Sequence, residues 1–315
     1  MFDPVSRERL VTFADRLRNF PIVLEVVPPH RRASEKVVQS LVQRVQAAVQ
    51  AAPRIDAVNL PEVLDENHAG RPFYRNLDPR IFAQRLKDGS QVETIVNRVV
   101  VHLSGEADFR EYLRDSVGSY GLRNFVFVGG TSSRIPYPGP DVVRANAILR
   151  EVAHGRADVA CGNILIPERV KEVERLLEKT RAGCGFFTTQ VLFEPEPVGS
   201  VLMEYSEGCA AEGLEPATVL LSFAPVADYE DVEFLVWLGA TITAETEEAL
   251  LANRGREAGR ASLDVARSIW GRIRDVMAAA SHPVPLGVNI EEISVHNFDL
   301  AVRMAQEFPA WRDAI

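Results

Sequence analysis

The stretch "RVVVHLSGEADFREYLRDSVGSYGLRNFVFVGG", residues 98 to 130, contains the pattern that decides the fold. Residues 98 to 104 and 124 to 130 are short runs rich in valine and phenylalanine, which is typical of buried strands. Between them, residues 106 to 121 carry apolar side chains at helical spacing and end in glycine, as helix C-termini often do. The stretch therefore predicts a strand, a helix and a second strand in succession.

The same alternation extends along the whole chain. The runs are continuously apolar, which a parallel sheet buried on both faces requires. Eight strands alternating with helices over 315 residues predict one (β/α)8 barrel domain spanning residues 1–315. A doubly wound open sheet is the structural alternative. The eight predicted strands are residues 22–27, 55–60, 98–104, 124–130, 157–165, 184–193, 218–226 and 284–290.

Two segments lie outside the simple repeat. The first 20 residues alternate charged and apolar side chains at helical spacing and predict an N-terminal helix without the apolar core of a secretory signal. The connection between the seventh and eighth strands is longer than the others. Its residues 245–280 can hold two helices, so we expect an extra helix there.

Composition limits the class of protein. No apolar run approaches the roughly 20 residues of a membrane helix, so we expect a cytoplasmic protein without a membrane partner. The formal net charge of −9 argues against a nucleic-acid partner and leaves a small-molecule ligand and a homo-oligomer open. The three cysteines and six histidines show no metal-ligand spacing, so no metal site is predicted.

Glu25 is the most informative single residue. It lies inside "FPIVLEVVPP", residues 20 to 29, where its strand neighbours are apolar. A carboxylate in such surroundings costs several kcal/mol unless it is paired, hydrogen-bonded or protonated. Because burial favours the neutral form, we expect a raised pKa and predict that Glu25 is a general acid.

Polar residues in the other predicted strands also fall at or past the middle of each run. In a (β/α)8 barrel these positions approach the C-terminal mouth, where such enzymes place their chemistry. Hydrogen bonding to a neighbouring loop is the alternative for a single asparagine or serine. Gln190 has both an acceptor and donors, which suits the edge of a flat heterocycle. The residues are Asn59, His102, Asn163, Gln190, Ser222 and Asn289, and the fourth run ends in Gly129 and Gly130.

Three passages together resemble the methylenetetrahydrofolate reductase family, which consists of (β/α)8 flavoproteins. "VLEVVPP" (23–29) is similar to the family's first strand. Residues 98–130 resemble its His-Leu-Thr strand, helix and following strand, and "LLEKTRAGCGFFTTQVLFEPE" (176–196) resembles the run that leads to its Ile-Thr-Gln strand. A weaker match covers residues 221–242. The similarities occur in the family's order from about residue 20 to 245.

The resemblance implies an activity and roles for individual residues. NAD(P)H would reduce FAD, which would pass hydride to 5,10-methylenetetrahydrofolate to form 5-methyltetrahydrofolate. Glu25 corresponds to the general acid and Gln190 to the residue that contacts the pterin, while Asn59, Ser222 and Asn289 would complete the folate pocket. The flavin would contact His102, Asn163, Glu172, Lys179 and the turn of Gly129, Gly130 and Thr131.

The departures from the family all concern the flavin. The family has Arg-Gly-Asp after the fourth strand, where this chain has Gly129, Gly130 and Thr131. Either FAD binds in an altered pocket through the backbone N–H groups of this turn, or NAD(P)H delivers hydride to the folate directly. A folate sensor or carrier without catalysis and a one-carbon methyltransferase partner are alternatives outside the reductase class.

Overall fold

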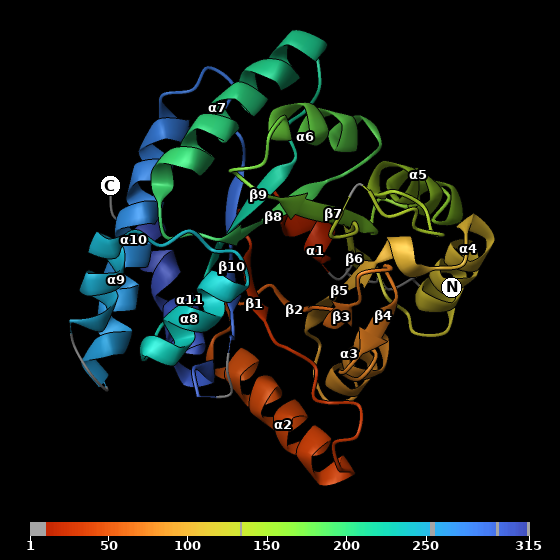
Figure 1. The fold of residues 1–315 in the computed structure, drawn as a ribbon, viewed down its shortest axis with the longest axis horizontal. Helices are drawn as coiled ribbons and strands as arrows, with labels where there is room; N and C mark the ends of the chain where they lie inside the picture. The colour runs from red at the N-terminus through yellow and green to blue at the C-terminus, as the bar shows by residue number, and fades with distance from the viewer. Residues whose placement is uncertain (1–10, 133, 253–255, 294–295, 314–315) are drawn as a thin grey trace, which may run out of the picture.

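Eight parallel strands close into a barrel in the computed structural model, which describes residues 11–132, 134–252, 256–293 and 296–313 (Figure 1). The first strand pairs with the last, Ile22 opposite Val288, so the sheet is closed and the open-sheet alternative is excluded. The strand order around the barrel is β1-β10-β9-β8-β7-β6-β5-β2. The strands are β1 (Ile22–Glu25), β2 (Ala57–Leu60), β5 (Glu93–Val99), β6 (Asn124–Val128), β7 (Ala160–Leu165), β8 (Phe186–Val191), β9 (Thr218–Phe223) and β10 (Leu286–Glu291).

Helices surround the barrel and cover the outward-facing apolar side chains of the strands (Figure 1). The two helices predicted within residues 245–280 are α9 and α10. None of the described helices is long and apolar enough to cross a membrane. The helices are α1 (Phe13–Arg16), α2 (Glu35–Ala51), α3 (Pro79–Lys87), α4 (Glu106–Gly118), α5 (Val142–Val152), α6 (Glu172–Arg181), α7 (Pro195–Glu212), α8 (Tyr229–Trp237), α9 (Ala244–Leu251), α10 (Arg256–Ala278) and α11 (Phe298–Asp313).

A layer of apolar side chains fills the N-terminal half of the barrel, and the short helix α1 closes the barrel at this end. Phe13 of α1 is fully buried and meets the ring of Phe186 edge-on, with 5.6 Å between the ring centroids. Gly162 leaves room for this ring, because an added Cβ would lie 2.4 Å from it. Residues 1–10 of the predicted N-terminal helix lie outside the described residues. The layer also contains Val23, Ala57, Ile95, Val126, Ala160 and Leu220.

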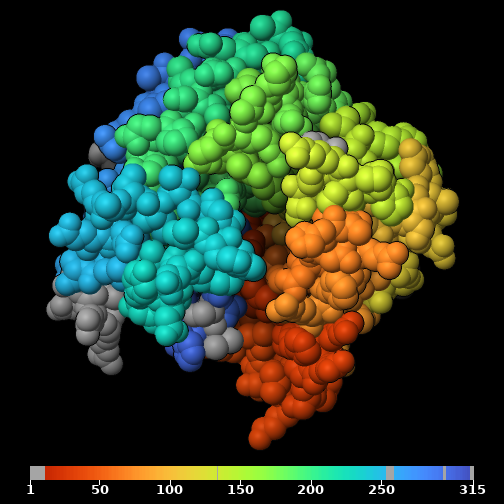
Figure 2. Space-filling view, viewed as in Figure 1, coloured from red at the N-terminus to blue at the C-terminus, as the bar shows by residue number. Residues whose placement is uncertain are grey.

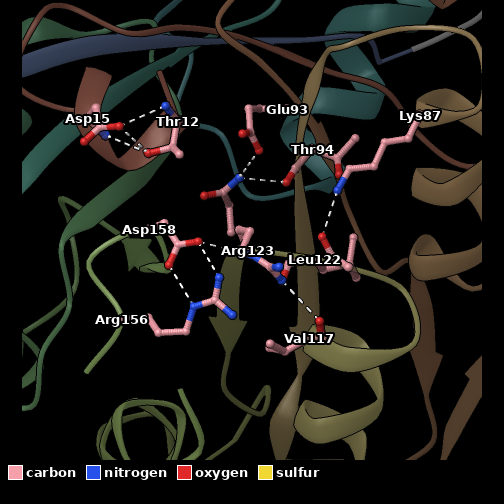
Figure 3. Close-up of polar contacts among 12 residues, drawn as sticks. Thr12, Asp15, Lys87, Glu93, Thr94, Val117, Leu122, Arg123, Arg156 and Asp158 are labelled. Carbon is pink, nitrogen blue, oxygen red and sulfur yellow. Dashed lines mark hydrogen bonds and ion pairs between the residues drawn. The ribbon is translucent and has the colours of Figure 1, made fainter. Parts of the chain in front are cut away.

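Polar contacts join neighbouring strands at the N-terminal end of the barrel (Figure 3). Asn124, at the start of β6, donates from Nδ2 to Glu93 Oε2 of β5 at 3.1 Å. Asp158, in the loop before β7, pairs with Arg123 at 3.3 Å and with Arg156 at 2.6 Å. This end of a (β/α)8 barrel serves stability rather than catalysis, so the site has to be sought at the opposite mouth.

The third predicted strand was placed too far along the chain. The strand is β5, Glu93–Val99, and a short 3-10 helix, Val100–His102, follows it, so His102 is not on a strand. The sequence pattern did not show that this strand begins at Glu93, because the polar residues Glu93 and Arg98 interrupt the apolar run. Both have partners: Glu93 accepts from Asn124, and Arg98 pairs with Glu62.

A two-stranded hairpin between β2 and α3 was not predicted. Its strands, β3 (Leu64–Glu66) and β4 (Pro72–Tyr74), are antiparallel, and three residues are too few to show a period in the sequence. Figure 2 shows a hollow at the centre of the molecule, between the orange segment that contains this hairpin and the cyan segment that contains α8. The hairpin and α8 therefore flank the opening on this face.

Candidate functional site

Four predicted residues meet at the C-terminal mouth of the barrel. Glu25 Oε2 accepts a hydrogen bond from Asn59 Nδ2 at 2.5 Å and another from Asn289 Nδ2 at 3.1 Å. Asn289 Nδ2 also lies 3.2 Å from Ser222 Oγ. These residues come from β1, β2, β10 and β9, and every second residue of a strand faces the same side. The alternation that points Val23 into the barrel also points Glu25 inward.

A cavity of about 250 Å³ opens above this layer. Gln190, from β8, lines it together with Glu25, so the structure brings both principal predicted residues to one place. Gln190 Nε2 donates to the backbone oxygen of Leu238, just after α8, at 3.0 Å, and this bond orients the amide. The described lining consists of Glu25, Asn97, Ile164, Ile166, Thr188, Thr189, Gln190, Asn289 and Glu291.

The cavity presents unpaired acceptors. Asn97 is 8% exposed and Asn289 is fully buried, and the side-chain oxygen of each has no partner among the described residues. Buried polar atoms are nearly always hydrogen-bonded in a finished assembly, so such oxygens are available to N–H groups of a ligand. Asn97 takes the position on β5 that was expected of His102. The available signal was its place in "TIVNRV", two residues after the apolar Ile95 that faces the barrel interior.

Burial raises the pKa of Glu25, and the hydrogen bonds from Asn289 and Asn59 act in the opposite direction. The direction agrees with the expectation from the apolar first strand. The two amide donors were not foreseen, and they fix the carboxyl group in one orientation. Glu25 therefore combines a shifted pKa with a defined geometry, as proton transfer requires.

The sequence argument missed a second carboxyl group, Glu291. It is the last residue of β10 and lies opposite Glu25 in the strand register. Burial and the charge of Glu25 raise the pKa of Glu291 well above its ordinary value, while bonds from Ser222 and Asn289 act against this. The eighth strand was predicted to end at residue 290. Continuing the alternation two residues beyond Asn289 would have found Glu291.

Three residues expected at the flavin are held inside the protein. Asn163 faces outward from β7 and accepts from Asn146 of α5 at 2.8 Å, because only its neighbours Gly162 and Ile164 face the barrel interior. Lys179 Nζ donates to the backbone oxygen of Ile164 at 2.8 Å and lies 3.8 Å from Glu172. Both charged side chains therefore have their partners within β7 and the helix that follows it.

The turn after β6 is covered by the chain's own side chains. The Thr131 backbone N–H donates to the Tyr137 hydroxyl at 3.1 Å, and that hydroxyl donates to Glu66 Oε1 at 2.7 Å. Thr131 Oγ1 donates to the same Glu66 oxygen at 2.8 Å, and His102 Nε2 lies 3.1 Å from the other. Gly130, which follows Gly129, lies so close to Tyr137 that an added Cβ would be 2.2 Å from the ring.

The residues that the resemblance assigns to FAD therefore do not fit it in this structure. The backbone N–H of Thr131 and Oε1 of Glu66 are already hydrogen-bonded, and Tyr137 occupies the space beside the turn. Burial lowers the pKa of His102, and the Arg98 charge adds to this while Glu66 opposes it. The contact of His102 with Glu66 joins the 3-10 helix Val100–His102 to the hairpin.

Two other hollows of the structure are less suited to chemistry. One, of about 290 Å³, lies beside the hairpin, but its charged side chains pair with each other, Arg98 with Glu62 and Arg80 with Asp78. The other is an open groove of about 580 Å³ between α7 and α10. Within the described residues, no group of three metal-ligating side chains was found. The barrel mouth is therefore the candidate site.

Comparison with known proteins shows the fold. The chain matches no family model and no curated protein sequence. It is similar in structure to an uncharacterized protein from Clostridium thermocellum that binds two copies of 5-methyl-5,6,7,8-tetrahydrofolic acid, with a TM-score of 0.74, 19% identity, and coverage of 94% of this chain and 98% of that one. The spore cortex-lytic enzyme SleL of Bacillus cereus has a TM-score of 0.50 and 10% identity, with coverage of 91% and 74%. Both likenesses place this chain among (β/α)8 barrels.

Proposed function

We propose that this protein binds a reduced folate at the barrel mouth and reduces 5,10-methylenetetrahydrofolate to 5-methyltetrahydrofolate with NAD(P)H. The observation that carries the proposal is the placement of Glu25, Asn289 and Gln190 around one cavity. The sequence resemblance to methylenetetrahydrofolate reductases supports it. The structural neighbour that binds 5-methyltetrahydrofolate supports the choice of ligand.

The chemistry of the cavity suits a pterin. The unpaired oxygens of Asn97 and Asn289 would accept from ring N–H and amino groups. The cavity is smaller than the range of about 300 to 1,000 Å³ usual for whole drug-sized ligands. We therefore expect the fused ring to occupy the cavity, with the aminobenzoyl-glutamate tail in the hollow between the hairpin and α8 (Figure 2).

Glu25 would act as the general acid. Its protonated carboxyl would donate a proton to N10 of the folate, and the bond between N10 and the methylene carbon would break with its electron pair going to N10. The lone pair of N5 then forms the iminium cation. Hydride from NAD(P)H adds to the methylene carbon to give the methyl group, and the nicotinamide leaves oxidised.

Direct hydride transfer is preferred over a flavin intermediate. The support is the turn after β6, where Tyr137 and Glu66 take the positions and hydrogen bonds that a flavin would need. A colourless purified protein that oxidises NADH or NADPH only when methylenetetrahydrofolate is present is the expected result. Flavin bound in stoichiometric amount would contradict this preference.

Glu25→Gln tests the activity. The substitution keeps the shape of the side chain and removes its titratable proton, so we expect folate-dependent nicotinamide oxidation to be abolished and calorimetric binding of 5-methyltetrahydrofolate to be retained. Near-normal turnover in this variant would exclude Glu25 as the acid.

Two other outcomes would identify another function. Tight binding of 5-methyltetrahydrofolate without turnover of either nucleotide in the wild-type protein would favour a sensor or carrier. Methyl transfer from 5-methyltetrahydrofolate to a corrinoid acceptor would favour a methyltransferase partner. Each assay uses the same purified full-length chain.

A further inference from the structure

Glu25 and Glu291 form a pair at the closure of the barrel. They are the last residues of β1 and β10, and their Cα atoms are partners in the parallel register. One nitrogen lies between the two carboxyl groups: Asn289 Nδ2 is 3.1 Å from Glu25 Oε2 and 3.3 Å from Glu291 Oε1. Both side chains line the same cavity.

The described residues around the pair supply no compensating positive charge. The neighbouring strands face it with uncharged side chains, and the charge of Arg44 of α2 acts on Glu292, the residue after the pair. Two carboxylates in a partly buried cavity repel each other strongly enough that only one ionises readily. The facing residues are Asn59 from β2, Asn97 from β5, Ile164 from β7, Gln190 from β8 and Ser222 from β9.

We propose that Glu25 and Glu291 share a single proton when the cavity is empty, and that Glu291 is a second functional carboxyl group of this site. Asn59 and Asn289 both donate to Glu25, which favours the ionised form of Glu25. The charge of Glu25 raises the pKa of Glu291 further, so the pair keeps its proton to a higher pH than an isolated glutamate would. Neither carboxyl alone would hold it as firmly.

The pair also has a role after proton transfer, which rests on the function proposed above. When the shared proton moves to N10 of the folate and the bond from N10 to the methylene carbon breaks, both carboxylates face the new iminium cation. The pair gains one negative charge as the folate gains one positive charge, so the total is conserved. Hydride addition neutralises the folate, and a proton from solvent restores the pair.

Carboxyl carbon NMR titration tests the pair without requiring activity. Full-length protein labelled at glutamate side-chain carbons is titrated as wild type, Glu25→Gln and Glu291→Gln. In wild type we expect one of the two carboxyls to titrate far above the ordinary range. Because coupling is reciprocal, each single variant should lower the pKa of the remaining carboxyl by about 1 to 3 units.

The kinetic counterpart is the pH profile of folate reduction. Activity falls at alkaline pH when the shared proton is lost. Glu291→Gln lowers the pKa of Glu25, so this alkaline limb of the pH profile should move to lower pH by about 1 to 3 units. Glu292→Gln is the matched control. Glu292 is the adjacent buried carboxyl, it is under the influence of the Arg44 charge, and it is not among the residues that line the cavity. It should leave the limb in place.

The outcomes separate this inference from the proposed function. Wild-type protein without folate turnover would refute the reductase, while the NMR titration would still decide the pair. Two carboxyls that both titrate in the ordinary range, or a Glu25 titration that does not respond to Glu291→Gln, would overturn the pair. If Glu291→Gln fails to fold, the same coupling is read from Glu291 in the Glu25→Gln variant.

Discussion

Glu292 offers the sharpest prediction about stability. It follows β10, is 5% exposed, and carries a carboxyl whose pKa burial raises to about 7, against partial compensation by Arg44. In the unfolded chain the ordinary value of 4.5 applies. Between these two values the folded protein binds a proton that the unfolded chain has lost. Its stability therefore falls as the pH rises from 4.5 to about 7, and the penalty stays constant above that.

The magnitude follows from the gap between the two pKa values. Each unit corresponds to about 1.4 kcal/mol, so the ionised side chain costs on the order of 3 kcal/mol above about pH 8. Glu292→Gln removes the ionisation and keeps the shape. We expect the variant to be more stable than wild type by about 3 kcal/mol near pH 8, and equal to it near pH 4, where the carboxyl is protonated in both states.

Urea unfolding followed by tryptophan fluorescence measures this difference at several pH values. Glu25 and Glu291 also make stability fall with rising pH, but they are present in both proteins and cancel in the comparison. The reasoning is refuted if the difference between variant and wild type is independent of pH. It is also refuted if Glu292→Gln destabilises the protein near pH 8.

Three further substitutions test the closure of the barrel by Phe13, the general acid Glu25 and the folate pocket. Phe13→Ala should lower the free energy of unfolding by about 3 to 5 kcal/mol in urea, because it empties the lower end of the barrel; a loss below about 1 kcal/mol would show that α1 is dispensable. Asn59→Leu removes a bond that favours ionised Glu25, so the alkaline limb of folate reduction should move to higher pH; a shift to lower pH would contradict the assignment. Gln190→Ala should weaken binding of 5-methyltetrahydrofolate by roughly 1 to 3 kcal/mol in calorimetry, and unchanged affinity would make Gln190 a structural link to Leu238.

Local pattern in the sequence was sufficient for the architecture. Eight apolar runs separated by helical segments predicted the barrel, because burial on both faces leaves a parallel strand no polar alternation. The same argument identified Glu25, since a lone carboxyl among Leu24 and Val26 is visible in the sequence itself. It failed at β5, where polar residues with tertiary partners interrupt the strand.

Tertiary structure alone decided the chemistry of the mouth. The sequence could not show that Glu291 lies beside Glu25, because ring closure brings the first and last strands together and sets their register. Nor could it show that Asn163 faces α5, since a shift of one residue exchanges the two faces of a strand. Tyr137 covers the turn after β6 through contacts with a hairpin distant in sequence. Residue types are local properties, whereas the partner of each buried polar group depends on which strands become neighbours.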